Sequence, residues 1–198
     1  DGLNILGTYA FAECELLTSI SIPASVTYIR NDVFRGTRLT SIDLSHTQIT
    51  VVPSYAFPNN KKLTSVLLPP TITTIQNYAF HDCNELEIIN LDSLLNLQAI
   101  GEYTFCNTNI KAADLSRSQL TSIPRYAFDM CRQLESIKLP NTVSSIGENA
   151  FEYTSLTSLE LPTSLLSIGR YAFNGAPIHG RLTLPASLQS IGESAFSS

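Results

Sequence analysis

The side chains that most often carry chemistry are scattered along this 198-residue chain. Its three histidines, His46, His81 and His179, stand in different parts of the sequence. Catalysis and metal binding both require groups that converge on one point. His81 and Cys83 could supply two metal ligands at most, which is too few for a tetrahedral site. We therefore predict solvated surface histidines, no metal site and no cofactor.

Motifs for other reactions are missing from the sequence as well. It contains no glycine-rich phosphate loop and no Gly-x-Ser-x-Gly nucleophile elbow, and its carboxylates are spread along the chain. Four glycines recur at one spacing, which a backbone turn explains: Gly101, Gly147, Gly169 and Gly192. The sequence therefore predicts no catalytic residues and a segment that is not an enzyme. An enzyme domain outside this segment stays an alternative.

The spacing of the phenylalanines indicates the structural elements that must position any functional site. The gaps between them run from 22 to 25 residues, and the nine are Phe11, Phe34, Phe57, Phe80, Phe105, Phe128, Phe151, Phe173 and Phe196. A period of this length is the signature of a solenoid. One such unit is too small to bury its own apolar stripe, whereas stacked units bury a continuous core. We expect the nine rings in one row, with the seven internal ones buried.

A strand-like segment follows each Phe up to the last. It reads Leu-x-x-Ile-x-Leu, often closed by Pro, as in residues 39–44 and 156–161. The alternation at its end is typical of a strand, and Pro stops a strand because it cannot donate to the ladder. We predict a β-rich solenoid over residues 1–198 with about eight coils, one parallel strand per coil on a single sheet face, and short turns or 3-10 segments opposite. No polar cap is visible at either end, so we expect a fragment of a longer protein.

The full repeat carries a family resemblance. It reads Leu-x-x-Ile-x-Leu-Pro-x-x-Leu-x-x-Ile-Gly-x-x-Ala-Phe-x-x-Cys, and residues 134–151 and 156–173 follow it almost throughout. This unit resembles the BspA-like class of leucine-rich repeats, over essentially all 198 residues. The resemblance implies a right-handed leucine-rich-repeat superhelix. Two copies depart from the pattern: residues 43–49 and 114–120 carry one extra residue, and Pro53 or Pro124 replaces the Gly.

The same resemblance implies a function. Members are largely surface proteins of bacteria and anaerobic protists, and many are adhesins that bind host proteins or other cells. It implies a non-enzymatic module at the cell surface or outside the cell that binds host or cell-surface proteins, or associates with itself, with any signal or anchor outside this segment. An intracellular, cytoplasmic scaffold solenoid stays the alternative, which a signal peptide or transmembrane anchor in the flanking sequence would exclude.

Charge and composition exclude two kinds of partner. The net charge is −5 and no basic stripe is present, so the segment is not expected to bind nucleic acid. No apolar run approaches the roughly 18 residues of a membrane helix, so we expect no direct membrane insertion by this segment. Only 15 % of residues are charged, and 23 Ser and 19 Thr supply the polar surface instead.

The four cysteines do not form a disulfide framework in the predicted solenoid. Cys14, Cys83 and Cys131 each follow their Phe by three residues, but none of their coils are adjacent. At about 5 Å per coil, their separations exceed the roughly 7 Å limit for bridged Cα atoms. Cys106 lies one coil from Cys83 and Cys131 but at a different repeat position. We therefore predict four free thiols, buried as structural residues.

The outward positions of the predicted sheet supply the candidate binding site. Most are small hydroxyl residues, but Leu67, Ile88 and Ala112 come from three consecutive strands. Aligned exposed apolar residues can mark a contact surface, although a solenoid sheet also tolerates a few outward aliphatics. We predict partner binding at the middle of the array, by Leu67, Ile88, Asn90 and Ala112 with Ser93, Leu94 and Leu95 of the adjacent loop.

Two further features have a functional and a structural interpretation. The loop at residues 92–96 is two residues longer than usual, and insertions in solenoids often map to binding faces. Alternatively, Leu94 and Leu95 fold back onto the core. The row Tyr55, Tyr78, Tyr103 and Tyr126 could form a half-exposed contact stack, but packing between coils also explains it.

Overall fold

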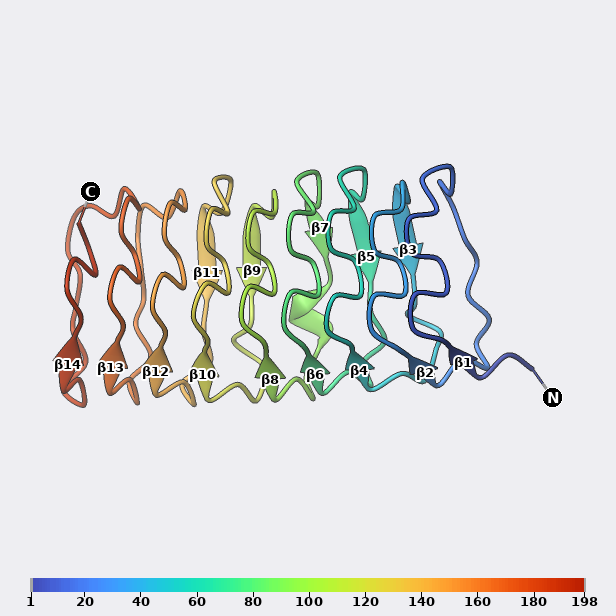
Figure 1. Cartoon of the computed structure of the whole chain (residues 1–198). Coiled ribbons are helices and arrows are strands. Elements are labelled where there is room, and N and C mark those ends of the chain that lie inside the picture. Colours follow the sequence, from blue (N-terminus) through green and yellow to red (C-terminus); the bar gives the residue numbers. More distant parts are fainter. Residues whose placement is uncertain (1, 198) are drawn as a thin grey trace.

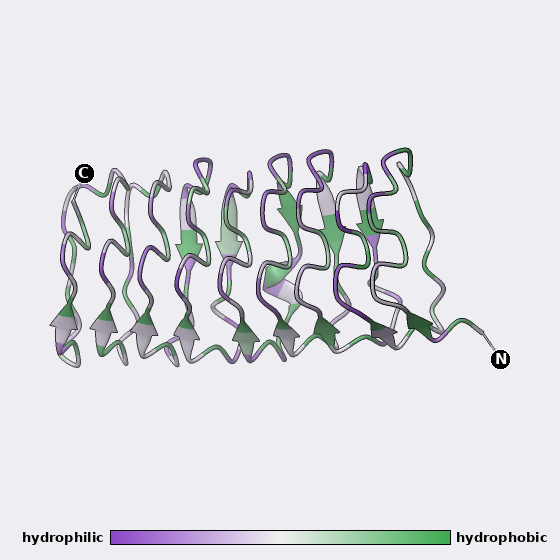
Figure 2. Cartoon of the chain, in the orientation of Figure 1, coloured by the Kyte–Doolittle hydropathy of each residue, from purple (hydrophilic) through white to green (hydrophobic). Residues whose placement is uncertain are grey.

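The computed structural model describes residues 2–197 and shows a parallel β-solenoid of about eight coils with about 23 residues each. The coils stack side by side from the N-terminal to the C-terminal end (Figure 1). Hydrophobic residues recur on the strands of successive coils, and hydrophilic residues occupy much of the connecting loops (Figure 2). The predicted repeat and superhelix are therefore confirmed.

Two rows of short parallel strands run along the array, one at the top and one at the bottom of Figure 1. The five-strand row contains β3 (Ser41–Asp43), β5 (Ser65–Leu67), β7 (Ile88–Ile89), β9 (Ala112–Asp114) and β11 (Ser136–Lys138). The nine-strand row contains β1 (Ile5–Leu6), β2 (Tyr28–Ile29), β4 (Val51–Val52), β6 (Thr74–Ile75), β8 (Ala99–Ile100), β10 (Ser122–Ile123), β12 (Ser145–Ile146), β13 (Ser167–Ile168) and β14 (Ser190–Ile191). A single 3-10 turn, η1 (Leu91–Ser93), is described.

The prediction of one strand per coil on one sheet face was wrong in two ways. Only five of the eight Leu-x-x-Ile-x-Leu segments form strands, and the remaining ones lie in the first and last coils of the array. The nine-strand row was not predicted at all. Its strands are two residues long, and a period of two cannot be recognised over so short a segment.

The nine-strand row is interrupted twice, and proline explains both seams. In a regular copy the residue after the strand donates its N–H to the preceding coil, as Gly147 does to the Ile123 carbonyl at 2.8 Å. Pro53 and Pro124 stand at this position and have no N–H. Accordingly, β4 does not pair with β2, and β10 does not pair with β8.

The phenylalanines form the centre of the core, as predicted. Successive rings stack with centroids 5.1–5.6 Å apart along the whole array. The seven internal rings are fully buried, whereas Phe11 and Phe196 are partly buried at the two ends. Because the stack is continuous, each ring is covered on both faces only when it has a neighbouring coil on each side.

The turns that carry each Phe follow a regular backbone alternation. Residues two before and two after the ring have positive φ in most coils, for example 56° at Tyr55 and 60° at Asn59. This alternation directs three N–H groups per coil toward the next coil, so that Tyr55, Phe57 and Asn59 donate to the carbonyls of Asn77, Ala79 and His81 at 2.8–3.1 Å. The turns therefore join the coils much as a strand ladder would.

Candidate binding surface

The five-strand row places the predicted apolar residues on its outer face. Leu67 ends β5, Ile88 begins β7 and Ala112 begins β9, and all three side chains are exposed. Leu67 is 39 % exposed and Ile88 is 60 % exposed. Their strand neighbours are polar, because Ser65 pairs with Ile88 and Asp43 with Leu67. The structure thus holds a short apolar surface on a polar sheet.

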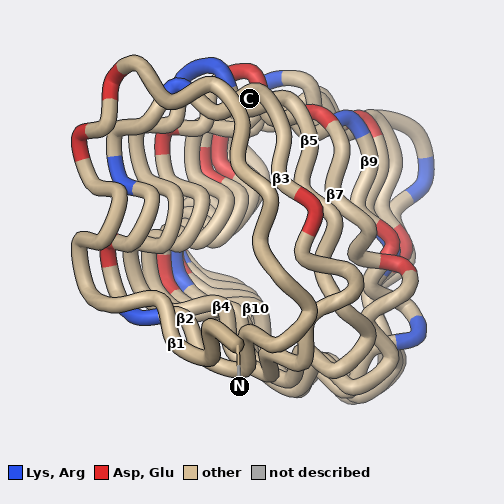
Figure 3. The backbone as a smooth tube through the Cα atoms, turned by 90° about the vertical axis from the view of Figure 1, so that its right-hand side faces the viewer, with Lys and Arg blue, Asp and Glu red and all other residues tan. Residues whose placement is uncertain are grey.

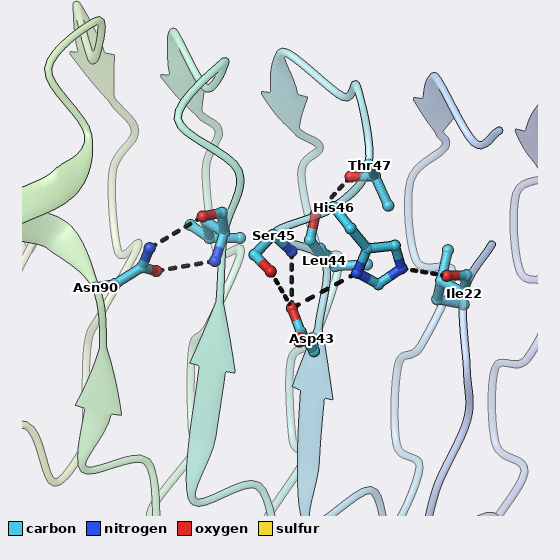
Figure 4. A network of polar contacts seen from close by, with 8 residues as sticks. Ile22, Asp43, Leu44, Ser45, His46, Thr47 and Asn90 are labelled. Atoms are coloured by element: carbon cyan, nitrogen blue, oxygen red, sulfur yellow. Dashed lines mark hydrogen bonds and ion pairs between the residues drawn. The ribbon is translucent and has the colours of Figure 1, made fainter. Parts of the chain in front are cut away.

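Asn90, a fourth predicted contact residue, has a structural task. Its side-chain Oδ1 accepts the Leu68 N–H at 2.8 Å and its Nδ2 donates to the Leu68 carbonyl at 2.9 Å (Figure 4). Nδ2 also lies 2.8 Å from Ser93 Oγ. The amide therefore bonds Leu68 as a neighbouring strand residue would, beyond the point where β7 ends. Asn90 supports the surface more than it presents a group to a partner.

The inserted loop is divided between core and surface. Leu94 is 1 % exposed and packs in the core, which corresponds to the folded-back alternative and removes it from any contact surface. Leu95 is 42 % exposed, and Ser93 is exposed while its hydroxyl donates to the Asn90 carbonyl at 2.8 Å. The η1 turn packs against β9, and β7 and β9 are not paired. The longer loop therefore separates the strands that carry Ile88 and Ala112.

A polar network borders this surface at β3. Asp43 Oδ1 accepts the N–H of Ser45 at 2.8 Å and its hydroxyl at 2.6 Å, and these bonds hold the pKa of Asp43 below its usual range (Figure 4). His46 Nε2 lies 2.6 Å from the Ile22 carbonyl, so Nε2 carries the donated proton. The half-exposed His46 therefore joins two coils.

The other two histidines differ from each other in burial. His81 is only 28 % exposed in its side chain and packs edge-on against Tyr78 and Tyr103, with ring centroids 5.5 and 6.2 Å away. The prediction of a solvated surface residue was therefore wrong for His81, because the wide aromatic rings of two coils cover it. His179 is exposed and bonds the carbonyl of Pro177.

The tyrosine row is a continuous stack on the turn side. Tyr55, Tyr78, Tyr103 and Tyr126 lie with ring centroids 4.8, 4.7 and 4.4 Å apart and nearly parallel planes. Burial, followed by the neighbouring tyrosines, raises the pKa of Tyr103 to about 12. Only Tyr55, at the N-terminal end of the stack, is classed as exposed. The row packs coils together and leaves little ring surface for a partner.

The four cysteines are free, as predicted, but their burial differs. Cys83 and Cys131 are buried, and each thiol lies 3.0 Å from a Phe carbonyl of the preceding coil. Cys14 is exposed, because no described coil stacks on that side of it to cover the same slot. The expectation of four buried thiols was therefore wrong for Cys14.

Asp129 is a buried acid whose surroundings disfavour its charged form. Asp129 is 7 % exposed, and its Oδ1 is buried without a hydrogen-bond partner. Its Oδ2 lies 3.7 Å from the buried thiol of Cys106. Burial, with the nearby Glu152 carboxylate, raises the pKa of Asp129 to about 6. Burial likewise raises the pKa of the Cys106 thiol, with Asp129 as the next cause.

Among residues 2–197, no three His, Cys, Asp or Glu side chains come close enough to hold a metal ion. Within the same residues, no helix is long and apolar enough to cross a membrane. The fold and surface therefore define a repeat solenoid whose accessible features are extended faces.

Comparison with known proteins identifies the class of repeat. The family model for the BspA type leucine rich repeat region matches residues 1–111 and 98–198, so the chain belongs to this family. A search of curated proteins found no significant match.

Solved structures show the same architecture. A leucine rich cell surface protein from Faecalibacterium prausnitzii is 25 % identical, with a TM-score of 0.71 over 88 % of this chain and 46 % of its own. A leucine-rich repeat protein from Bacteroides ovatus is 21 % identical, with a TM-score of 0.51 over 98 % of this chain and 68 % of its own. The pneumococcal vaccine antigen PcpA is 19 % identical, with a TM-score of 0.52 over 96 % of this chain and 64 % of its own. The chain thus spans less than two thirds of two of these proteins.

Proposed function

We propose that this chain is a non-catalytic protein-binding module of a cell-surface or secreted protein. The observation that carries the proposal is the exposed apolar run of Leu67 and Ile88 on the paired strands β5 and β7, with Ala112 exposed on β9 beyond the inserted loop. The F. prausnitzii relative is a cell surface protein, which supports this location.

The surface has the composition of a small contact site. Some surrounding outward positions carry small hydroxyl side chains, Ser41, Ser65 and Ser136, which cost less to desolvate than charges. Others are charged, namely Asp43, Asp114 and Lys138, and form part of a polar rim. Apolar anchors within a polar rim concentrate binding energy in most interfaces. Leu95 in the inserted loop is a further exposed apolar side chain. A protein partner, or a second copy of the chain, would therefore be held at this part of the five-strand row.

The proposal is tested by placing charges on the apolar run. The double variant Leu67→Lys with Ile88→Lys should keep the thermal stability of the parent, because both side chains are exposed and a lysine opposite Asp43 adds no like-charge repulsion. A matched control, Ser19→Lys with Ser158→Lys, adds the same charge at exposed serines in coils beyond the two ends of the five-strand row. Binding to a panel of purified host matrix and cell-surface proteins, and self-association by sedimentation, are measured for each.

We expect the first variant to lose binding or self-association and the control to keep most of it. A first variant that binds as well as the parent would show that the surface is placed wrongly. The separate variant Leu95→Ser tests the contribution of the loop. Labelling of intact source cells with an antibody against residues 1–198 tests the surface location, and labelling only after permeabilisation would favour the intracellular scaffold.

A further inference from the structure

The nine-strand row carries a second surface, on a different side of the coil from the five-strand row (Figure 3). A depression of about 440 Å³ lies over the seam between β2 and β4. This volume falls within the range of roughly 300–1,000 Å³ typical of small-molecule sites. The polar side chains that line it come from four coils and include Thr8, Tyr28, Arg30, Asn31, Thr50 and Gln76.

The seam explains why a hollow forms at this point. Arg30 donates its N–H to the Leu6 carbonyl at 3.0 Å, which continues the row from the first coil. Pro53 cannot make the corresponding bond to Ile29, and β2 and β4 remain unpaired. Both Ile29 and Pro53 are buried beneath the depression. The floor therefore contains the apolar side chains of Ile29 and Pro53, and most of the wall residues are polar.

The second seam shows that the fold does not require these wall residues. At β8 and β10, Pro124 takes the position of Pro53, while Ala99 and Gly101 take the positions of Tyr28 and Arg30. The same interruption thus forms with neither an aromatic ring nor a cation. The side chains of Tyr28 and Arg30 are consequently not explained by the need to build the seam.

The polar groups of the depression are open to a ligand. Tyr28 is 56 % exposed, and the guanidinium carbon of Arg30 lies 5.7 Å from its ring centroid. Within residues 2–197, Arg30 forms no ion pair with a carboxylate, in contrast to Arg125, which pairs with Glu102 at 2.8 Å. Over the same residues, the side chains of Thr8, Asn31 and Thr50 make no hydrogen bond in the protein. One cation is therefore surrounded by hydroxyl and amide groups.

We propose that this depression binds a saccharide that bears a carboxylate. The Arg30 guanidinium matches a carboxylate with two parallel hydrogen bonds. Threonine hydroxyls and the Asn31 amide both donate and accept, which suits sugar hydroxyls. Gln76 offers its Nε2 as a donor, because its Oε1 already accepts the Ser54 N–H at 2.9 Å. The Tyr28 ring supplies an apolar face and a hydroxyl. This site lies apart from the five-strand row, so it does not depend on the proposed protein-binding function.

A peptide fits the depression less well. A peptide held as an added strand needs a sheet edge with free N–H and C=O groups. The unpaired edges of β2 and β4 face each other across the seam with Cα atoms within 8 Å, which leaves no room for a strand between them. Apolar anchoring is limited as well, because Ile29 and Pro53 are buried and Val51 is half-buried. The accessible groups are complementary to hydroxyls and one negative charge.

The test uses the 198-residue chain labelled with ¹⁵N and titrated with digalacturonate. The chemical shifts of residues 27–30, 50–52 and 76 should move together, while those of the five-strand row should not. Arg30→Gln should weaken binding about tenfold or more, since hydrogen bonds to charged groups contribute roughly 1.5–3 kcal/mol. Arg30→Lys should bind at an intermediate level, because it keeps the charge but loses the paired geometry.

Matched controls separate this site from general charge attraction. Arg38→Gln removes an equal charge elsewhere and should change the affinity by less than about twofold. The neutral disaccharide galactobiose should bind about tenfold more weakly than digalacturonate. Equal binding by Arg30→Gln, no shifts at millimolar sugar, or the same shifts produced more strongly by a glutamate-rich peptide would each overturn the proposal.

Discussion

Replacing the buried acid by its amide, Asp129→Asn, should stabilise the protein at neutral pH. Asp129 is 7 % exposed, has an unpaired buried oxygen and lies near the Glu152 carboxylate. Its ionised form is therefore desolvated and repelled by Glu152, and the Cys106 thiol and the Arg132 charge compensate this only in part. The amide keeps the shape and an acceptor for the Cys106 thiol, and it removes the charge.

The sign and size follow from proton linkage. The pKa of Asp129 is raised from 3.8 to about 6, so the folded state binds this proton more tightly than the unfolded state. The stability contributed by this group is present below pH 3.8 and is lost as the pH rises through about 6. The pKa difference corresponds to at most about 3 kcal/mol. Because the side chain lies close to the surface and solvent screens part of this, we expect a gain of about 1–2 kcal/mol at pH 7.5.

The measurement is urea unfolding of parent and variant between pH 4 and pH 8. The gain from Asp129→Asn should increase from about pH 4 to about pH 6 and stay constant above. Asp43→Asn is the matched control, because the Ser45 hydrogen bonds lower the pKa of Asp43 and favour its charged form. The control should not gain stability at pH 7.5. A gain from Asp129→Asn that is absent, or equal at pH 4 and pH 7.5, would refute the reasoning.

Three further predictions concern the repeat. Phe105→Ala, in the middle of the ring stack, should lower the free energy of unfolding by about 3–5 kcal/mol, and a loss below about 1 kcal/mol by urea titration would contradict the packing. A thiol reagent should count four free thiols in denatured, unreduced protein, and in the native protein Cys14 should react first because it alone is exposed; a denatured count of two would disprove it. Asn90→Ala should cost about 1–3 kcal/mol, since it leaves the Leu68 N–H and carbonyl without their side-chain partner, and an unchanged melting temperature would argue against this role.

The repeat and its core were predictable because they depend on side chains of one type at one spacing. A ring every 22 to 25 residues has few explanations other than a stack, and the stack is what the structure shows. That the four cysteines are free followed from the same register, because the spacing of the coils fixes the distance between equivalent positions. Cys14 departed because no described coil covers its slot on the N-terminal side.

The candidate binding surface was predictable only in part. The exposure of Leu67 and Ile88 followed from strand alternation, which fixes the direction of every second side chain. The direction of Asn90 and Leu94 depends on how the inserted loop closes. Asn90 turns to the backbone of Leu68 and Leu94 enters the core, and neither direction can be obtained from a two-residue period. The depression beside Tyr28 was missed because its strand row was missed.

The two prolines show that the lack of one backbone N–H changes strand pairing along the nine-strand row. The sequence repeat identified Pro53 and Pro124 as departures from Gly. Their effect on strand pairing, however, depends on which carbonyl would have accepted the missing N–H. On the turn side the coils stay joined across both seams, with Phe34 donating to Ala56 at 3.0 Å and Phe105 to Ala127 at 2.9 Å. On the strand side the nine-strand row is divided into three sheets. At each seam the coils are therefore hydrogen-bonded on the turn side, and their strands are unpaired on the strand side. A repeat that is nearly uniform in sequence thus has two positions along its length that differ from the rest.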